Sequence, residues 1–115
     1  MRKDRSSRRI SIVAKDAVDV LAALAQTHRL ALFRLLVQAG PTGVSAGDIA
    51  DRLKISPSSL SFHLAKLINA GLISDERQGT SIIYRADYRA MTQLLAFLTQ
   101  DCCRGVDLTM QESSK

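Results

Sequence analysis

Residues 45–71, SAGDIADRLKISPSSLSFHLAKLINAG, decide the fold, because they predict two helices joined by a short turn. The first helix begins at Ser45, whose hydroxyl can cap free backbone N–H groups at a helix start. Asp48 stands three residues later, where its carboxylate complements the positive end of the helix dipole. The apolar spacing stops around Lys54 and Ile55, so this helix is short.

The second helix begins at Ser56, because a serine cap is followed by Pro57 at the first helical position, and it ends at Gly71. Its apolar residues recur at helical spacing and predict a buried stripe of Leu60, Leu64, Leu67 and Ile68. The residues off that stripe are assigned to the exposed face, and they are Ser58, Ser59, Ser61, Phe62, His63 and Lys66. A short helix, a tight turn and a longer helix with early hydroxylated positions form a helix-turn-helix. Such a second helix fits the major groove of DNA, whereas the alternative is an ordinary capped helical hairpin.

A β-hairpin is predicted directly after this helix. Residues 72–77 and 80–86 form short strands around Gln78-Gly79, a two-residue connection with glycine where a positive φ is easiest. A hairpin in this place is a wing, and its basic tip is expected along the DNA backbone or minor groove. Since the two motifs together are much rarer than a helical hairpin alone, DNA binding is the favoured function. The predicted DNA-binding residues are Ser56, Ser58, Ser59, Ser61, Phe62, His63 and Lys66 in the helix, and Arg77, Gln78 and Thr80 in the wing.

The composition of the 115 residues fits one small domain with an aliphatic, mostly helical core, since 46% are hydrophobic and only 4% aromatic. No apolar run approaches the roughly 20 residues that span a bilayer, and no hydrophobic signal region follows the basic start. A cytoplasmic protein with no membrane partner is therefore expected. Most of the net charge of +5 lies in residues 1–11, a flexible basic arm that either reaches DNA phosphates or is only a solvated tail or vector remnant. The DNA-binding and dimerisation domain is expected at residues 12–105, and a flexible tail at residues 106–115.

Three further helices are predicted. One runs from residue 12 or 13 to residue 26 with an apolar stripe, and the next begins at a Thr27 cap, is apolar nearly all round and stops at Gly40-Pro41. Asp87 caps the last helix, whose stripe comprises Tyr88, Met91, Leu94, Leu95 and Leu98. A winged domain this small has little core left for the first and last helices, so their apolar faces predict a dimer interface. The expected fold is mostly α with a small β-hairpin, a winged helix-turn-helix that is homodimeric through its first and last helices.

The chain resembles the ArsR/SmtB family of metal- and metalloid-responsive repressors over roughly residues 14–105. The resemblance is carried by LAALAQTHRLALFRLLVQAG and by ISPSSLSFHLAKLINAGLISDERQGTSIIYRA, which includes the family's recognition helix and its exit into the wing. Phe62 stands where the family more often has a charged or polar residue, a difference that bears on which bases are read. The resemblance implies a homodimer that represses its operator and lets go when an inducer binds. Two common family sites are missing, since SAGDIADRL has no cysteine pair and the last helix has no histidines to join Asp87 in a zinc site.

The inducer site is expected at Cys102 and Cys103, the two cysteines of the chain. Adjacent cysteines make a poor structural disulfide, but thiolates prefer thiophilic ions, and both sulfurs can meet one ion where the helix frays. Some arsenic-responsive members that the chain resembles carry such a pair after the same helix, so the expected inducer is trivalent arsenic or antimony, which takes up to three thiolates. Those members usually add a third cysteine several residues on, whereas residues 106–112 contain none. Three options follow: two thiolates suffice, a small cellular thiol supplies the third ligand, or the chain is a weak sensor.

Other interpretations stay open. One is that the cysteine pair is a redox or persulfide switch in the same kind of repressor. Another is that the two cysteines only pack, or do nothing. A winged-helix protein-interaction module is the alternative from another functional class. An enzyme is not expected, because the sequence shows no nucleophile with a base, no paired carboxylates and no glycine loop to cradle a phosphate.

Overall fold

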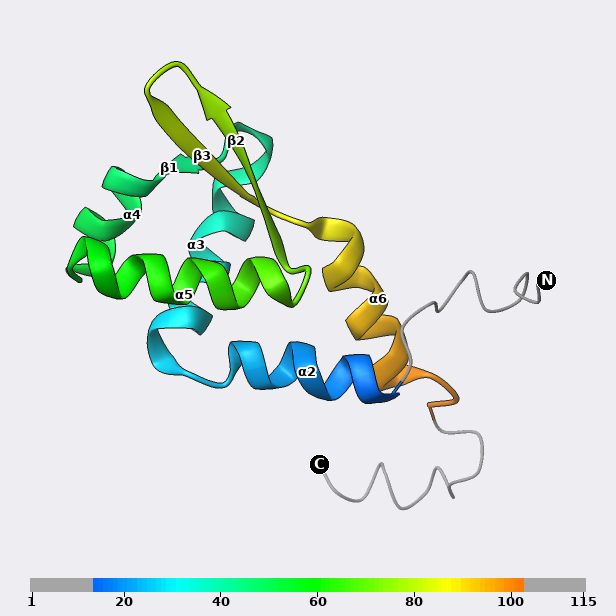
Figure 1. Cartoon of the computed structure of the whole chain (residues 1–115). Helices are drawn as coiled ribbons and strands as arrows, with labels where there is room; N and C mark the ends of the chain where they lie inside the picture. Colours follow the sequence, from blue (N-terminus) through cyan, green and yellow to red (C-terminus); the bar gives the residue numbers. More distant parts are fainter. Residues whose placement is uncertain (1–13, 103–115) are drawn as a thin grey trace, which may run out of the picture.

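The computed structural model describes residues 14–102, which form a winged helix-turn-helix (Figure 1). Its elements in chain order are α2 (Ala14–Leu24), α3 (Thr27–Ala39), the 3-10 helix η1 (Gly40–Thr42), β1 (Val44–Ser45), α4 (Ala46–Leu53), α5 (Pro57–Asn69), β2 (Ile73–Gln78), β3 (Ser81–Ala86) and α6 (Tyr88–Thr99). The predicted fold, mostly helical with a small hairpin, is confirmed. The basic arm, the C-terminal tail and Cys103 lie outside the described residues.

The core is mostly aliphatic and joins α3, α4, α5 and the start of the wing. Its most deeply buried large side chains are Leu32, Leu36, Ile49, Leu67 and Leu72. Each such side chain contributes about 1.5–3 kcal/mol by leaving water. The stripe predicted for the second helix of the helix-turn-helix faces this core, since Leu60, Leu64 and Leu67 are all buried.

α3 supplies the middle of the core, but it is not buried on all sides as its apolar sequence predicts. Leu32, Phe33 and Leu36 are buried, whereas Leu30 keeps 46% of its surface exposed. The helix therefore has one inner face and one face that α2, α5 and β3 leave uncovered.

The N-cap of α3 differs from the prediction by one residue. Gln26, not Thr27, is the cap, because its backbone is extended (φ −157°, ψ 135°) and its side-chain oxygen accepts a hydrogen bond from the Arg29 N–H at 2.9 Å. Thr27 is already helical. The predicted stop is confirmed, since Gly40 has a φ of +77° at the C-cap.

The wing belongs to a three-stranded antiparallel sheet with the order β1-β3-β2. The sequence does not reveal β1, which is two residues long and pairs Val44 with Tyr84 and Ser45 with Ile83. A strand this short has no period of its own, so only its partner in the folded chain defines it.

The hairpin turn is also shifted by one residue from its predicted place. Gln78 pairs with Ser81, so the connection is Gly79-Thr80 and not Gln78-Gly79. Gly79 has a φ of +64°, a conformation that glycine adopts without steric cost. The glycine therefore has its predicted role at the first position of the turn instead of the second.

Gly43 lies where the chain enters β1 and passes very close to β3. Its φ of 72° and ψ of −175° belong to a region that is essentially open to glycine alone. A Cβ at this position would lie 2.6 Å from Ile83 Cγ2 and 2.7 Å from the Tyr84 backbone oxygen. β1 can therefore pair with β3 of the wing only because residue 43 has no side chain.

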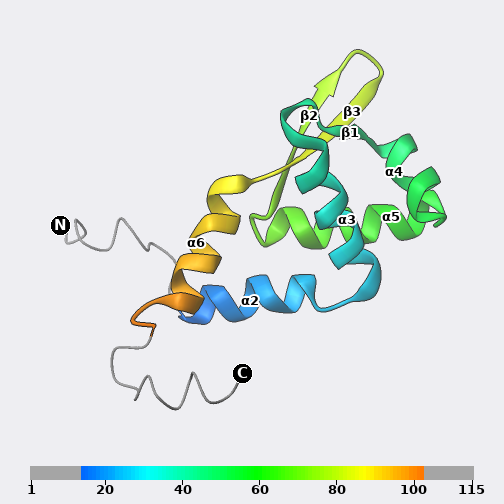
Figure 2. The ribbon, with the colours of Figure 1, turned by 180° about the vertical axis from the view of Figure 1, so that it is seen from behind.

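α2 and the C-terminal half of α6 lie at the end of the domain away from the wing tip, and α6 ends beside the start of α2 (Figures 1 and 2). Ala17, Val20 and Leu94 are buried on these helices. Four other large apolar side chains on these helices are exposed, and we call them the apolar end face: Val18 (64%), Leu21 (40%), Leu95 (53%) and Leu98 (54%). A single chain leaves this face in water, which is typical of a protein-binding surface.

No single helix within residues 14–102 is both long and apolar enough to cross a bilayer. Lys15–Leu24 and Thr27–Thr42 meet the criteria of length and composition only as a pair, and the two segments are bent by 97°. The second segment contains Leu32 and Leu36, which are buried in the core of the domain.

Candidate DNA-binding surface

The helix-turn-helix is held by the caps that its sequence predicts. The Ser45 hydroxyl accepts a hydrogen bond from the Asp48 backbone N–H at 3.2 Å. The Ser56 hydroxyl accepts one from the Ser59 backbone N–H at 3.1 Å. Lys54 adopts the left-handed conformation (φ 57°, ψ 48°), which ends α4 and turns the chain toward α5. Local hydrogen bonds therefore fix the position of α5 relative to α4.

α5 presents an exposed face made mostly of small polar side chains. The predicted DNA-binding residues that are exposed on it are Ser58, Ser59, Ser61, Phe62 and Lys66. Serine adds little bulk, so the helix can approach base edges closely, and its hydroxyl both donates and accepts hydrogen bonds. Ser56 is exposed as well, although its oxygen already serves the helix cap. Contact of these residues with bases or phosphates stays a prediction.

His63 is the residue of this set whose predicted place is wrong. It was expected on the exposed face, but it is 8% exposed and faces the interior. The reason is its spacing, because it lies three residues after Leu60 and four before Leu67, both of which are buried. A side chain in this position is not available to read bases.

The partners of His63 come from the start of α3. The Arg29 guanidinium lies 3.3 Å from His63 Nδ1, and the ring centroids of His28 and His63 are 5.6 Å apart. The Arg29 Nε also donates to the Ala23 carbonyl at 2.6 Å. Arg29 thereby joins α2, the helix that carries Val18 and Leu21 of the apolar end face, to α5. Burial lowers the pKa of His63, and the positive charges of Arg29 and His28 lower it further.

This depressed pKa predicts a pH dependence of stability. The folded state favours the neutral ring, so its stabilisation is complete above the ordinary pKa of 6.5 and is lost as the pH falls below that value. Urea unfolding measured from about pH 8 to about pH 5 should show this loss in the wild type and a smaller one in His63→Gln, which has no imidazole. Equal slopes of unfolding free energy against pH in the two proteins would contradict the assignment.

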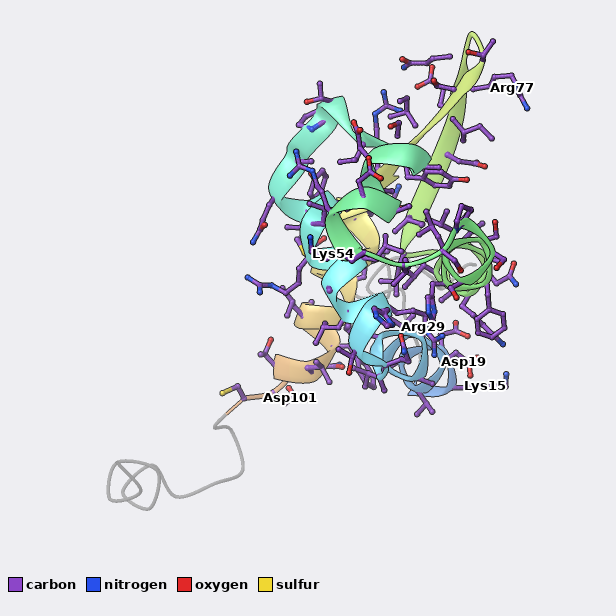
Figure 3. All side chains as sticks on the ribbon, turned by 90° about the vertical axis from the view of Figure 1, so that its left-hand side faces the viewer. Lys15, Asp19, Arg29, Lys54, Arg77 and Asp101 are labelled. Atoms are coloured by element: carbon purple, nitrogen blue, oxygen red, sulfur yellow. The ribbon has the colours of Figure 1, made fainter. Side chains whose placement is uncertain are left out.

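The wing tip carries the other predicted DNA-binding residues. Arg77, Gln78 and Thr80 are all exposed, as expected. Figure 3 views α5 end-on and shows Arg77 projecting from the hairpin on the side of the molecule where α5 lies. A duplex that lies along α5 can therefore meet a positive charge on the wing.

The base of the wing is held by Arg85 on β3. Its guanidinium donates to Glu76 Oε1 at 2.7 Å and to the Pro41 carbonyl at 2.6 Å. The first bond neutralises the acidic side chain next to Arg77 in the sequence, and the second ties the wing to η1. The sequence gives no sign of these contacts, because Pro41 and Arg85 are 44 positions apart.

The predicted inducer site begins just beyond α6. The helix ends at Thr99, Asp101 has a φ of +60°, and the Cys102 N–H donates to the Thr99 carbonyl at 2.9 Å. Cys102 is exposed in this turn, and Cys103 lies outside the described residues. Within residues 14–102, no three His, Cys, Asp or Glu side chains lie close enough to hold a metal ion.

Comparison with known proteins identifies the family. A model of a helix-turn-helix domain matches residues 24–76. The HTH-type transcriptional regulator YgaV of Escherichia coli is 31% identical over 90 residues, which are 78% of this chain and 89% of YgaV. The arsenical resistance operon repressor of Bacillus subtilis is 35% identical over 81 residues, 70% of this chain and 73% of the repressor. This chain belongs to the ArsR/SmtB family. It is thus one of a group of transcriptional regulators that bind DNA, which agrees with the expectation that it is not an enzyme.

A solved structure of a similar protein supports the fold. It is the homodimeric winged helix-turn-helix domain of Mb0332 from Mycobacterium bovis, described as a possible ArsR-family regulator. It has 25% sequence identity and a TM-score of 0.59 to this chain, and it covers 87% of this chain and 92% of its own. This chain therefore shares its fold, including the wing, with a solved winged helix-turn-helix domain.

Proposed function

We propose that this ArsR-family chain is a homodimeric repressor that binds operator DNA and is released by a thiophilic inducer at Cys102 and Cys103. One observation carries the DNA-binding part, namely the serine-rich exposed face of α5 on the same side of the molecule as Arg77 of the wing. Small hydroxyl groups fit into the major groove, and the positive charges of Lys66 and Arg77 can pair with backbone phosphates.

The apolar end face supports the homodimer. Its four large side chains, on α2 and α6, are 40–64% exposed in one chain and would be covered by the same face of a second copy. Mb0332, which has the same fold, is described as homodimeric. If a two-fold axis passes through this face, the dimer presents two copies of α5. These two helices would bind half-sites about 34 Å apart along one side of a duplex.

The cysteine pair supports the inducer. Thiolates are soft ligands and suit trivalent arsenic or antimony better than zinc, which prefers four ligands. Two sulfurs come from the chain, and a small cellular thiol would supply a third. Because Cys102 lies in the turn that ends α6, three residues after Thr99, an ion that draws the pair together would act on a helix that carries part of the apolar end face. By linkage, an ion that binds the DNA-free dimer better must weaken DNA binding by the same free energy.

The decisive test compares the wild type with the double variant Cys102→Ser plus Cys103→Ser. An operator duplex is first enriched from a randomised duplex library, and its affinity for the reduced protein is followed by fluorescence anisotropy. Arsenite is expected to weaken wild-type binding by about tenfold or more, within the usual range of allosteric coupling. The double variant should bind the duplex equally well and ignore arsenite, since serine keeps the size but not the soft sulfur. If the double variant still leaves the duplex when arsenite is added, the inducer site lies elsewhere.

Thiol oxidation is the second candidate signal, and the exposure of Cys102 favours it because an oxidant can reach this sulfur. Titration of the same complex with hydrogen peroxide in the absence of arsenite separates the two signals. Release by peroxide alone, with no response to arsenite or antimonite, would replace the metalloid by a redox switch. A protein-interaction module is excluded if the library yields an enriched duplex.

A further inference from the structure

Phe62 is a large apolar side chain on an otherwise small or polar face of α5. It lies four residues after Ser58, near the centre of the exposed face, and 56% of its surface is exposed. Leu60, Leu64 and Leu67, which face the core, lie on the opposite side of the helix. The ring therefore points where a bound duplex would be, and not toward the rest of the domain.

The orientation of the ring is set by its neighbours. The His63 ring packs edge-on against it, with centroids 5.6 Å apart and planes at 67°. The Lys66 ammonium lies 5.3 Å from its centroid, over one face of the ring. His63 is itself buried beside Arg29, which is bonded to α2. An exposed side chain that is already held in one orientation loses little entropy when it binds.

The chemistry of the ring restricts what it can recognise. A phenyl ring offers no hydrogen bond to the donors and acceptors that line the major groove. The apolar group in that groove is the 5-methyl of thymine, whose contact with phenylalanine is a known mode of base recognition. Wedging of a ring between bases is typical of minor-groove proteins, whereas a recognition helix lies in the major groove.

We propose that Phe62 contacts the 5-methyl group of a thymine and so sets a thymine preference at one base pair of each operator half-site. The inference rests on the proposed DNA-binding function. Lys66, one turn further along α5, covers one face of the ring and leaves the rest of it for the methyl group, while its ammonium can reach a neighbouring phosphate or guanine.

Deoxyuridine tests this contact, because it differs from thymidine only by the missing methyl group. Each thymine of the library-enriched duplex is replaced in turn, in both half-sites, and affinity is measured by fluorescence anisotropy for the wild type, Phe62→Ala and Phe62→Leu. In the wild type, one symmetric pair of replacements should weaken binding about 15-fold, which is about fourfold for each buried methyl-sized group. Phe62→Ala should bind the thymine and uracil duplexes with nearly equal affinity, and Phe62→Leu should keep part of the difference because leucine is also apolar.

Leu30→Ala is the matched control, since Leu30 is similarly exposed (46%) but belongs to α3, and it should show the wild-type uracil effect. The inference is overturned if no thymine position shows more than about a twofold uracil effect in the wild type, or if Phe62→Ala keeps the full effect. Failure of the proposed function has a different signature, because then the library yields no enriched duplex at all.

Discussion

Replacing Leu98 with glutamate is expected to convert the dimer into monomers and to weaken operator binding by about a hundredfold or more. Leu98 and Leu95 on α6 are 54% and 53% exposed, and both belong to the apolar end face. A carboxylate at this place would be buried without a partner in the dimer, which costs several kcal/mol. Each monomer would then hold a single half-site and lose the gain that comes from linking two. Sedimentation velocity gives the mass, and fluorescence anisotropy gives the affinity.

Leu30→Glu is the control for this experiment. Leu30 is also a large exposed side chain, but it lies on α3 outside the apolar end face. This variant should remain a dimer, so a general effect of an added carboxylate can be told from an effect on the interface. A Leu98→Glu protein that still sediments as a dimer would show that the two copies meet through another surface.

Gly43→Ala is expected to lower the free energy of unfolding by about 3 kcal/mol. Part of the loss comes from a backbone conformation that alanine rarely adopts (φ 72°, ψ −175°). The rest comes from a methyl group placed 2.6 Å from Ile83 and 2.7 Å from the Tyr84 oxygen, which would push β1 off β3. Urea unfolding followed by circular dichroism measures the difference.

Gly40→Ala separates the two causes. Gly40 also has a positive φ (+77°), but a Cβ there would meet no atom within 4 Å. Only the conformational term remains, so this variant should lose about 1 kcal/mol. Equal losses in the two variants would mean that the close approach of β1 to β3 contributes nothing to stability.

Local sequence signals predicted most of the fold correctly. Ser45, Ser56 and Asp87 are N-caps as expected, and each accepts a hydrogen bond from the residue three positions later. Such bonds depend on a few adjacent residues, so a short window of sequence contains all the information they need. The apolar stripe of α5 is predictable for the same reason.

Features that depend on distant partners were not predictable in this way. β1 is defined only by its pairing with β3, and the Arg85 bond to Pro41 spans 44 positions. A polar side chain such as that of His63 is expected on the outer face of a helix, although its spacing from Leu60 and Leu67 favours the inner one. Its burial depends on Arg29, which lies 34 positions away and supplies a polar partner in the interior.

The candidate site shows the same division. The sequence located the exposed serines of α5 and the wing tip, because helical periodicity and turn residues are local. It could not tell that Phe62 is held by Lys66 and His63, since that requires side-chain orientations within the folded helix.

The central claim is that two copies of this chain hold two copies of α5 against one duplex. Sedimentation of the protein with the library-enriched duplex, combined with chemical footprinting, tests this claim most directly. We predict two chains on each duplex and two protected segments about 10–11 base pairs apart on one face of the DNA. Failure of the library to yield an enriched duplex, or a complex with a single chain and one protected segment, would contradict the account.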